Sequence, residues 1–389
     1  MHDVPLVFSD AQYWKSFLPL SFTKPVSEMR MGMLTFSQRW KLLLEAKNIG
    51  YLTEDYLQEK YTTPQKKEGL FLVPNFIPTR DILEKIKSLH KGEALVYRND
   101  IIAARATLDN FQFGNIEKTR DIKENLIFIK NSTDLFTYNH LAINFDFDLL
   151  TKNKTSHKLS ITNGLLGNPD DIFIEEGARV EFSTLNTKEG KIYIGKEAEI
   201  MEGSHLRGPV AIGEQAKINM GAKVYGATTI GPHSRIGGEV SNLIVFGFSN
   251  KGHDGFLGNS VIGEWCNLGA GTNSSNLKNN YSPVKLWDYR KEKFETTKMQ
   301  FVGVIMGDHA KTAINSQLNT GTSVGVGANI FTSGFPPNLI PNFSWGGNRN
   351  DEKFSLEKFY ESAEKMMERR KCSLSKTDKS ILKFIYLSK

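Results

Sequence analysis

One histidine, His253, stands in a polar, glycine-rich segment that reads Asn-Lys-Gly-His-Asp-Gly-Phe-Leu-Gly-Asn from Asn250 to Asn259. Imidazole titrates near neutral pH, so a histidine in such a segment can accept a proton from a reacting group as a general base. A histidine in a surface loop more often only forms hydrogen bonds, and the residues alone leave this alternative open. His253 is the first candidate for chemistry in the chain.

The other residue types that bind metals or act as nucleophiles form no recognisable pattern. The two cysteines, Cys266 and Cys372, are far apart and lack metal-ligand spacing, so we expect free thiols in a reducing compartment. His205, His233 and His309 are titratable, but nothing in their spacing places them together. We therefore expect no metal site here, and Cys266 is not expected to be a nucleophile.

A repeat of six residues precedes the His253 segment. Aliphatic residues recur at every sixth position without a break at Ile194, Ile200, Leu206, Ile212, Ile218, Val224, Ile230 and Ile236. Glycine follows at Gly195, Gly213 and Gly231, so that three hexads make one turn of a triangular coil. An α-helix of 3.6 residues per turn cannot keep this pattern on one face, whereas the short strands of a solenoid can. The repeat predicts a left-handed parallel β-helix.

The same period continues beyond the histidine. It resumes at Ile262 and Leu268, returns at Met306 and continues to Ile330, and weaker coils begin near Ile174. The pattern is lost over residues 271–302, which are rich in Asn, Lys, Tyr and Trp. We expect this segment to be a loop that projects from a corner of one coil, and long insertions of this kind are often functional.

The residues before the repeat have a different pattern. Strand-like apolar runs alternate with helical stretches, the strands at 70–73, 94–97 and 101–104 and the helices over 34–46 and from Thr79. In the first helix, Leu42, Leu43 and Leu44 are expected to be buried. This alternation predicts an α/β domain.

Changes in composition predict four parts of the chain. We expect an α/β domain over residues 1–150, a polar and basic linker over 151–172, the β-helix over 173–345, and a helical tail over 346–389. In the tail, a helix from Glu352 to Lys371 has an apolar side. This side is expected to dock against the end of the β-helix or against another subunit.

Two segments of the second half resemble a known family. His253 is followed by an aromatic residue, by Leu-Gly, and then by Asn-Leu-Gly-Ala-Gly-Thr at 267–272. Asn276-Leu277 and the projecting loop then precede Gly-Asp-His-Ala-Lys-Thr-Ala-Ile-Asn at 307–315. This order is similar to that of the bifunctional sugar-1-phosphate nucleotidylyltransferase/acetyltransferases, and most of all to a bacterial branch of sugar nucleotidyltransferases. The likeness covers roughly residues 190–345.

The resemblance implies acetyl transfer from acetyl-CoA to an amino-sugar phosphate or nucleotide sugar, in nucleotide-sugar or cell-envelope biosynthesis. It makes His253 the base that takes the proton of the attacking amine. It also marks positions for substrate and coenzyme, which are Arg235, Lys251, Asn267 and Asn276 for the sugar phosphate and Ala270 and Lys311 for acetyl-CoA. The two asparagines can equally serve as hydrogen-bonding residues at coil corners. Acyl-CoA grooves of this family lie between subunits, so a homotrimer is expected.

The first domain shares only part of the family's pattern. The segment from Leu18 to Pro25 resembles a Pro-Leu-Thr…Lys-Pro segment of sugar-1-phosphate nucleotidylyltransferases, which makes Lys24 a candidate phosphate contact. The family's glycine-rich triphosphate loop has no counterpart, because no glycine precedes Gly32. Asp146 and Asp148 are either Mg²⁺ ligands beside a bound nucleoside triphosphate or, as we favour, acids in surface turns. We expect a nucleotidylyltransferase-like fold with little or no nucleotidyl transfer.

Composition is that of an ordinary globular protein, with 39% hydrophobic residues, 24% charged residues and a net charge of +6. No long basic tract indicates a nucleic-acid partner, and no apolar run indicates a membrane anchor, so a cytoplasmic protein is expected. Two alternatives to the acetyltransferase stay open. One is an active sugar-1-phosphate nucleotidylyltransferase with a β-helix that only trimerises, and the other is a non-catalytic, sugar-nucleotide-binding regulatory protein.

Overall fold

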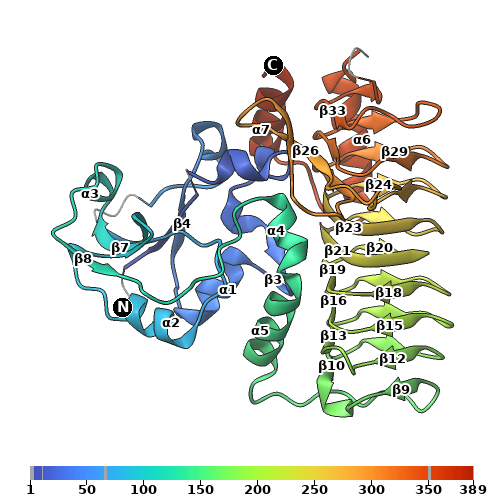
Figure 1. The fold of residues 1–389 in the computed structure, drawn as a ribbon, viewed down its shortest axis with the longest axis horizontal. Helices are drawn as coiled ribbons and strands as arrows, with labels where there is room; N and C mark the ends of the chain where they lie inside the picture. Colours follow the sequence, from blue (N-terminus) through green and yellow to red (C-terminus); the bar gives the residue numbers. More distant parts are fainter. Residues whose placement is uncertain (1–3, 11, 65–67, 349–351, 389) are drawn as a thin grey trace.

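The computed structural model describes residues 4–10, 12–64, 68–348 and 352–388. An α/β domain lies beside a long β-helix, and two helices near the C-terminus lie at one end of the β-helix (Figure 1). This arrangement confirms the predicted fold class.

Six strands form the sheet of the α/β domain, in the order β4, β1, β5, β7, β6 and β8. Their bounds are β1 (Leu6–Ser9), β4 (Ile49–Leu52), β5 (Glu68–Leu72), β6 (Glu93–Tyr97), β7 (Asp100–Thr107) and β8 (Lys118–Asp121). β1 is parallel to β4 and β5, whereas β7 is antiparallel to β5 and β6. The predicted strands at 70–73, 94–97 and 101–104 correspond to β5, β6 and β7.

Helices and short 3₁₀ turns surround this sheet. They are η1 (Trp14–Phe17), η2 (Leu20–Phe22), η3 (Val26–Glu28), α1 (Phe36–Leu43), η4 (Asp55–Leu57), α2 (Arg80–Lys87), α3 (Leu108–Gln112), α4 (Ser132–Thr137) and α5 (Asn139–Thr151). α2 begins at the predicted place, because the side chain of Thr79 accepts a hydrogen bond from the amide of Ile82.

α1 differs from the predicted helix over 34–46. Its N-terminus is set by a capping box between Thr35 and Gln38, and the preceding strand β3 (Leu34–Thr35) pairs with β2 (Arg30–Met31). The prediction that Leu42 is buried is wrong, since 48% of it is exposed. Trp40 enters the core instead and donates a hydrogen bond to the carbonyl of Pro74.

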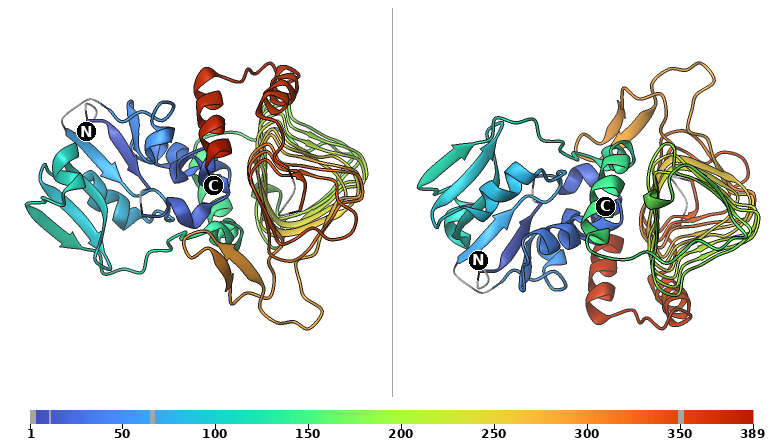
Figure 2. Two further views of the ribbon diagram at one scale, coloured as in Figure 1. Left: turned by 90° about the horizontal axis from the view of Figure 1, so that it is seen from above. Right: turned by 90° about the horizontal axis from the view of Figure 1, so that it is seen from below.

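The β-helix has three faces of parallel strands, which Figure 2 shows end-on as a triangle. Face 1 consists of β10 (Ile172–Ile174), β13 (Ile192–Ile194), β16 (Val210–Ile212), β19 (Thr228–Ile230), the second parts of β21 (Glu239–Gly247) and β23 (Phe256–Glu264), β28 (Val304–Met306), β31 (Thr322–Val324) and β33 (Leu339–Ile340). Face 2 consists of β11 (Arg179–Val180), β14 (Glu199–Ile200), β17 (Lys217–Ile218), β20 (Arg235–Ile236), β22 (Asn250–Lys251), β24 (Asn267–Leu268), β29 (Lys311–Thr312), β32 (Asn329–Ile330) and β34 (Trp345–Gly346). Face 3 consists of β9 (Gly164–Leu166), β12 (Thr184–Asn186), β15 (His205–Arg207), β18 (Lys223–Tyr225), the first parts of β21 and β23, β25 (Asn273–Ser274) and β30 (Gln317–Leu318).

Each face contributes a ladder of inward side chains to one apolar core. The hexad residues of the sequence are in these ladders, and those from Ile194 to Ile236 are all buried. The register of face 2 places Ile218, Ile236, Lys251 and Leu268 on successive strands. The six-residue period therefore arises because every coil places one residue of each strand inside.

The coils near His253 depart from the regular length. The corner between β17 and β18 has four residues, 219–222, whereas the corner between β20 and β21 has only Gly237 and Gly238. The corner between β22 and β23 again has four residues, 252–255. A Cβ atom at Gly237 would lie 2.5 Å from the carbonyl oxygen of Gly252, so the short corner packs directly on the corner that carries His253.

Three segments extend the β-helix. The span predicted as linker contains η5 (Pro169–Asp171) and β9, which pairs with β12, so the first strand of the β-helix lies inside that span. The predicted projecting loop contains an antiparallel hairpin of β26 (Lys285–Asp288) and β27 (Lys293–Thr296). The tail forms α6 (Leu356–Glu368) and α7 (Lys376–Leu387).

The α/β domain packs against face 1 of the β-helix (Figure 2). Their shared core brings Phe17, Met31 and Phe36 of the domain together with Ile244, Phe246 and other outward residues of face 1. α7 adds a second contact, because Phe384 stacks on Tyr56 with 4.1 Å between ring centroids. No helix among the described residues is long and apolar enough to cross a membrane.

Candidate functional site

His253 lies in the corner 252–255, on the edge between faces 2 and 3 and opposite face 1, on which the α/β domain packs. Its side chain is exposed, and within the described part of the chain its ring has no hydrogen-bond partner. The backbone that carries it is held firmly. The carbonyls of Gly252, His253 and Asp254 accept hydrogen bonds from Asn219 Nδ2, Lys251 Nζ and the Gly271 amide, at 2.7, 2.8 and 3.1 Å. A free imidazole on a fixed turn is suited to proton transfer.

Three of the predicted site residues share the outer surface of face 2. Arg235, Asn250, Asn267 and Lys311 occupy successive strands in register. Neighbouring strands are ~4.8 Å apart, so these side chains form a continuous polar row. Asn250 Nδ2 donates to Asn267 Oδ1 at 3.0 Å. The row runs along the axis of the β-helix, beside the edge that carries His253.

The two ends of this row have different environments. Arg235 is exposed, and burial together with the guanidinium groups of Arg235 and Arg369 lowers the pKa of Arg370. Lys311 is partly buried beside α6, where its Nζ lies 3.4 Å from Ser362 Oγ, and burial lowers its pKa. The open, cationic end of the row is therefore the end near Arg235.

Lys251 does not project toward solvent. It occupies the inward ladder of face 2, is 3% exposed, and donates hydrogen bonds to the carbonyls of Gly237 and His253, both at 2.8 Å. The prediction that it holds a sugar phosphate is wrong, because its ammonium lies inside the β-helix. Burial lowers its pKa to about 8, although the carboxylate of Asp254 acts in the opposite direction.

Ala270 and Asn276 lie on different edges. Ala270 is in the corner 269–272, one coil beyond His253 on the same edge. Asn276 lies across face 3, where its Nδ2 donates to Asn259 Oδ1 at 2.9 Å and its carbonyl accepts from the Val302 amide. Within one chain, Asn276 therefore closes the base of the projecting loop and does not approach His253.

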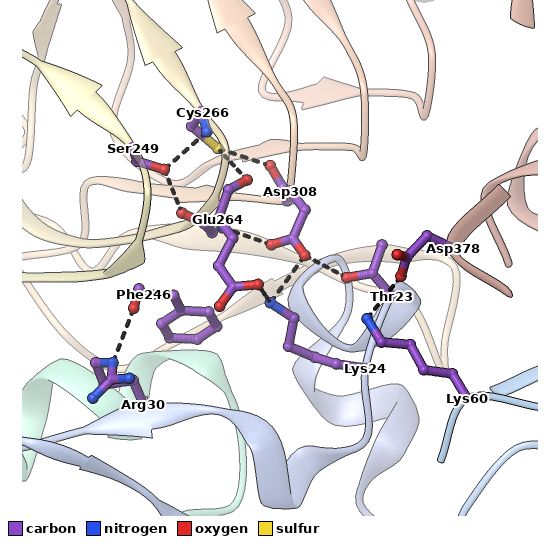
Figure 3. A network of polar contacts seen from close by, with 12 residues as sticks. Thr23, Lys24, Arg30, Lys60, Phe246, Ser249, Glu264, Cys266, Asp308 and Asp378 are labelled. Carbon is purple, nitrogen blue, oxygen red and sulfur yellow. Dashed lines mark hydrogen bonds and ion pairs between the residues drawn. The ribbon is translucent and has the colours of Figure 1, made fainter. Parts of the chain in front are cut away.

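Lys24 lies at the interface between the α/β domain and the β-helix (Figure 3). Its Nζ lies 2.8 Å from Glu264 Oε2 and 2.9 Å from Asp308 Oδ2, and Thr23 Oγ1 donates to the same oxygen of Asp308 at 2.6 Å. Burial alone lowers the pKa of Lys24, but the two carboxylates outweigh it and hold the pKa above its usual value. The predicted phosphate contact is wrong in this structure, since the ammonium is neutralised by the β-helix.

The expected carboxylates for Mg²⁺ are not a metal site. Asp146 is fully buried in α5, where it binds Arg39 through both oxygens at 2.7 and 2.9 Å and accepts from the Met33 amide at 2.8 Å. Asp148 is exposed and pairs with Lys191. The interpretation of both as acids in surface turns is also wrong, because both lie on a helix. Among the described residues, no group of three His, Cys, Asp or Glu side chains is placed to hold a metal.

The segment that replaces the glycine-rich loop is filled by large side chains. η1 and η2 bury Trp14, Phe17 and Leu20. Trp14 and Ser21 are joined by two hydrogen bonds of 2.8 and 2.6 Å between side chain and backbone. Backbone amides are therefore not presented to a triphosphate here as a glycine loop would present them.

Cys266 is buried in the β-helix, and both cysteines are free thiols, as expected. Burial raises the pKa of Cys266 to about 12. A thiol in this environment is not a nucleophile at neutral pH.

Three exposed apolar side chains on the His253 edge, which are separated by other residues along it, were missed by the sequence reasoning. Phe182, Met220 and Ile314 are 66, 72 and 71% exposed. Each stands two positions after an inward residue of face 2, and His253 stands two positions after Lys251 in the same way. This regular offset is the signal that could have placed these side chains and His253 on one edge.

Parts of the chain are similar to known proteins. A family model described as sugar nucleotidyl transferase matches residues 6–155. The "Bifunctional protein GlmU" of Methanocaldococcus jannaschii is 36% identical over 87 residues, which are 22% of this chain and 21% of that protein. The "Bifunctional sugar-1-phosphate nucleotidylyltransferase/acetyltransferase" of Sulfurisphaera tokodaii is 34% identical over 144 residues, 36% of this chain and 35% of the relative. The matches thus span about a fifth to a third of these relatives.

Among solved structures, the UDP-N-acetylglucosamine acyltransferase from Campylobacter jejuni aligns with 60% of this chain and 97% of its own, at 14% identity and a TM-score of 0.28. The family model covers the α/β domain. Residues 6–155 match the sugar nucleotidyl transferase family, and parts of the chain are similar to bifunctional sugar-1-phosphate nucleotidylyltransferase/acetyltransferases.

Proposed function

We propose that this protein transfers an acetyl group from acetyl-CoA to the amine of an amino-sugar phosphate or nucleotide sugar, with His253 as the general base. The observation that carries the proposal is the exposed imidazole of His253, which has no partner within the described chain and stands on a turn whose carbonyls are all bonded. The acetyltransferase function printed in the name of the Sulfurisphaera tokodaii relative supports the reaction class.

The proton balance of this reaction needs one base. The amine nitrogen attacks the thioester carbonyl, His253 takes the proton that the nitrogen loses, and the carbon–sulfur bond breaks to release coenzyme A, whose thiolate recovers the proton. Attack needs a neutral amine, and imidazole is suited to accept its proton near neutral pH. The buried thiol of Cys266 has no part in this scheme.

The proposed substrate lies near the outer row of face 2. Arg235 is exposed, and Arg370 lies close enough to interact with it electrostatically, so the two can bind a phosphate on the acceptor. Ala270 lies on the His253 edge and has no bulk that would block a pantetheine arm. Lys311 reaches the coenzyme phosphates in this proposal only if it leaves Ser362.

We infer a homotrimer from the uncovered edge. Face 1 is covered by the α/β domain, whereas the edge with Phe182, Met220 and Ile314 is exposed. Exposed apolar side chains that gather on one surface often mark a site of contact between proteins. Packing three copies around a threefold axis at this edge would cover these side chains and place a neighbouring subunit beside each His253.

Release of coenzyme A tests the function. The wild-type protein is incubated with acetyl-CoA and a panel of amino-sugar phosphates, and free thiol is measured. His253→Ala and His253→Asn should lose ~10²–10⁴-fold in kcat and still bind acetyl-CoA as trimers. His140→Ala, an exposed histidine on α5, is the matched control and should keep full activity. The assignment is wrong if the wild type releases no coenzyme A with any acceptor, or if His253→Ala equals an active wild type.

Nucleotidyl transfer is the second candidate function, because the family model matches the whole α/β domain. The filled loop at η1 and the ion pairs of Lys24 are arguments against it.

A further inference from the structure

Lys251 is the only charged residue at the inward positions of face 2 in the part of the chain that the structure describes. Its neighbours in that ladder are Ile218, Ile236 and Leu268, which are fully apolar and buried. An aliphatic side chain would fill this position without any cost of removing a charge from water, whereas a buried ammonium is costly unless it is paired or hydrogen-bonded. Packing alone therefore does not account for a lysine here.

Lys251 donates hydrogen bonds to backbone carbonyls in two neighbouring corners of the β-helix. Its Nζ donates to Gly237 O in the two-residue corner and to His253 O in the next corner, both at 2.8 Å. Asn219 Nδ2, in the corner two coils before, donates to Gly252 O and so reaches past the two-residue corner to the turn of His253. The ammonium thus ties the turn of His253 to the preceding coil from the inside.

The short corner explains why the turn of His253 needs a hydrogen bond from a side chain. Gly237 and Gly238 replace a four-residue corner, so the coil before His253 offers fewer backbone groups to the turn 252–255. Among the residues that the structure describes, no backbone amide donates to His253 O, whereas Asp254 O and Gly255 O accept from the amides of Gly271 and Glu239 at 3.1 and 3.2 Å. The side chain of Lys251 supplies the missing donor.

We propose that Lys251 is a positioning residue for His253: from within the core it bonds the carbonyl of the histidine itself and so fixes where the imidazole stands on the edge. This inference rests on the proposed role of His253 as the base. Lys251 touches neither substrate nor coenzyme. Loss of its donor should free the turn and lower the chance that the imidazole meets the amine in the reactive geometry, while binding of acetyl-CoA at the rest of the edge is unaffected.

Lys251→Met tests the proposal, because methionine keeps an unbranched apolar stem and loses the donor. Ile236→Met is the matched control on the adjacent strand of the same ladder, where only packing changes. We expect Lys251→Met to remain folded and trimeric and to lose at least tenfold in kcat, with KM for acetyl-CoA within about twofold. Ile236→Met should keep kcat within about twofold.

Hydrogen exchange supplies a readout that does not depend on activity. The amides of Glu239 and Gly271 donate to Gly255 and Asp254 of the turn, so they report on its opening. In Lys251→Met they should exchange at least tenfold faster than in the wild type and in Ile236→Met. Unchanged exchange at these amides overturns the proposal, and so does an unchanged kcat in an active enzyme. If the wild type shows no acetyl transfer, the proposed function fails, and the exchange rates alone then decide whether Lys251 holds the turn.

Discussion

The ammonium of Lys24 lies 2.9 Å from a carboxylate oxygen of Asp308, so a lysine of the first domain and an aspartate of the β-helix form a buried ion pair. Glu264 completes the pair as a second acceptor at 2.8 Å. The family motif that marks this lysine as a phosphate contact is present, but the charge of the lysine is neutralised by two carboxylates of the β-helix. In this chain it joins two domains.

Lys24→Met should destabilise the protein strongly. Removing one partner from a buried ion pair typically costs about 3–5 kcal/mol. Here the buried carboxylate of Asp308 loses its counter-charge, whereas Glu264, whose side chain is 35% exposed, can be solvated by water. Lys60→Met is the control, since the pair of Lys60 with Asp378 is partly exposed and should contribute less than about 1 kcal/mol. Urea denaturation of the two variants checks this difference. Equal midpoints for the two variants would contradict the structural role of Lys24.

Asp146→Asn should also destabilise by about 3–5 kcal/mol, because it leaves the buried guanidinium of Arg39 without its anion. Asp148→Asn, which removes an exposed carboxylate, should have little effect. The melting temperatures are compared with Mg²⁺ and with EDTA. If Asp146 instead holds a metal, Mg²⁺ would stabilise the wild type and not the Asp146 variant.

His309 should make the protein sensitive to mild acid. Burial, and then the charges of Lys311 and Lys24, lower its pKa to about 3 from an ordinary value of 6.5. Between these values the unfolded state binds the extra proton, so the free energy of unfolding falls as the pH is lowered, by at most about 1.4 kcal/mol per pH unit. His309→Phe keeps the ring contacts with Trp265 and Phe359 and removes the titration. As the pH is lowered from 6.5 to 4.5, the free energy of unfolding should fall more for the wild type than for the variant. If both fall equally, His309 makes no contribution to acid sensitivity.

The exposed edge should hold the subunits together. Met220→Lys and Ile314→Lys each place a charge on an edge that a threefold axis would bury, so we expect trimers to dissociate at micromolar concentration. Phe113→Lys changes an equally exposed residue of the α/β domain and should leave the trimer intact. Light scattering measures the mass of each variant. A wild-type monomer, or charged variants that stay trimeric, would place the interface elsewhere.

The α/β domain should be a poor nucleotidylyltransferase. Trp14, Phe17 and Leu20 occupy the segment where the family's amides would stabilise the phosphoryl charge, and Lys24 is already paired. Pyrophosphate release is measured with Mg²⁺, sugar 1-phosphates and the common nucleoside triphosphates. Turnover at an ordinary rate of ~1–10³ per second would show that another arrangement of this domain is active.

The parts of the structure that could be predicted are those that produce a repeat in the local sequence. Ile194 to Ile236 revealed the β-helix, because each coil repeats the same inward positions. Contacts between distant segments left no local signal, as for Lys24 with Glu264 and Asp308. Lys251 shows a second reason. A lysine is expected to face water, and only the register with Ile236 shows that this one points inward.

The docking of the α/β domain on face 1 has a consequence for how the β-helix opens. A solenoid is held by contacts between neighbouring coils and normally frays from its ends. Here Phe17, Phe36 and their neighbours pack on β21, β23 and β28, which adds non-local contacts to the middle coils. β9, whose residues are all exposed, has no such support. Phe147 of α5 also packs on Phe173 and Tyr193 of β10 and β13, so the support extends to these early coils but not to β9. A pulling force applied along the axis should therefore peel β9 away before the coils that carry His253.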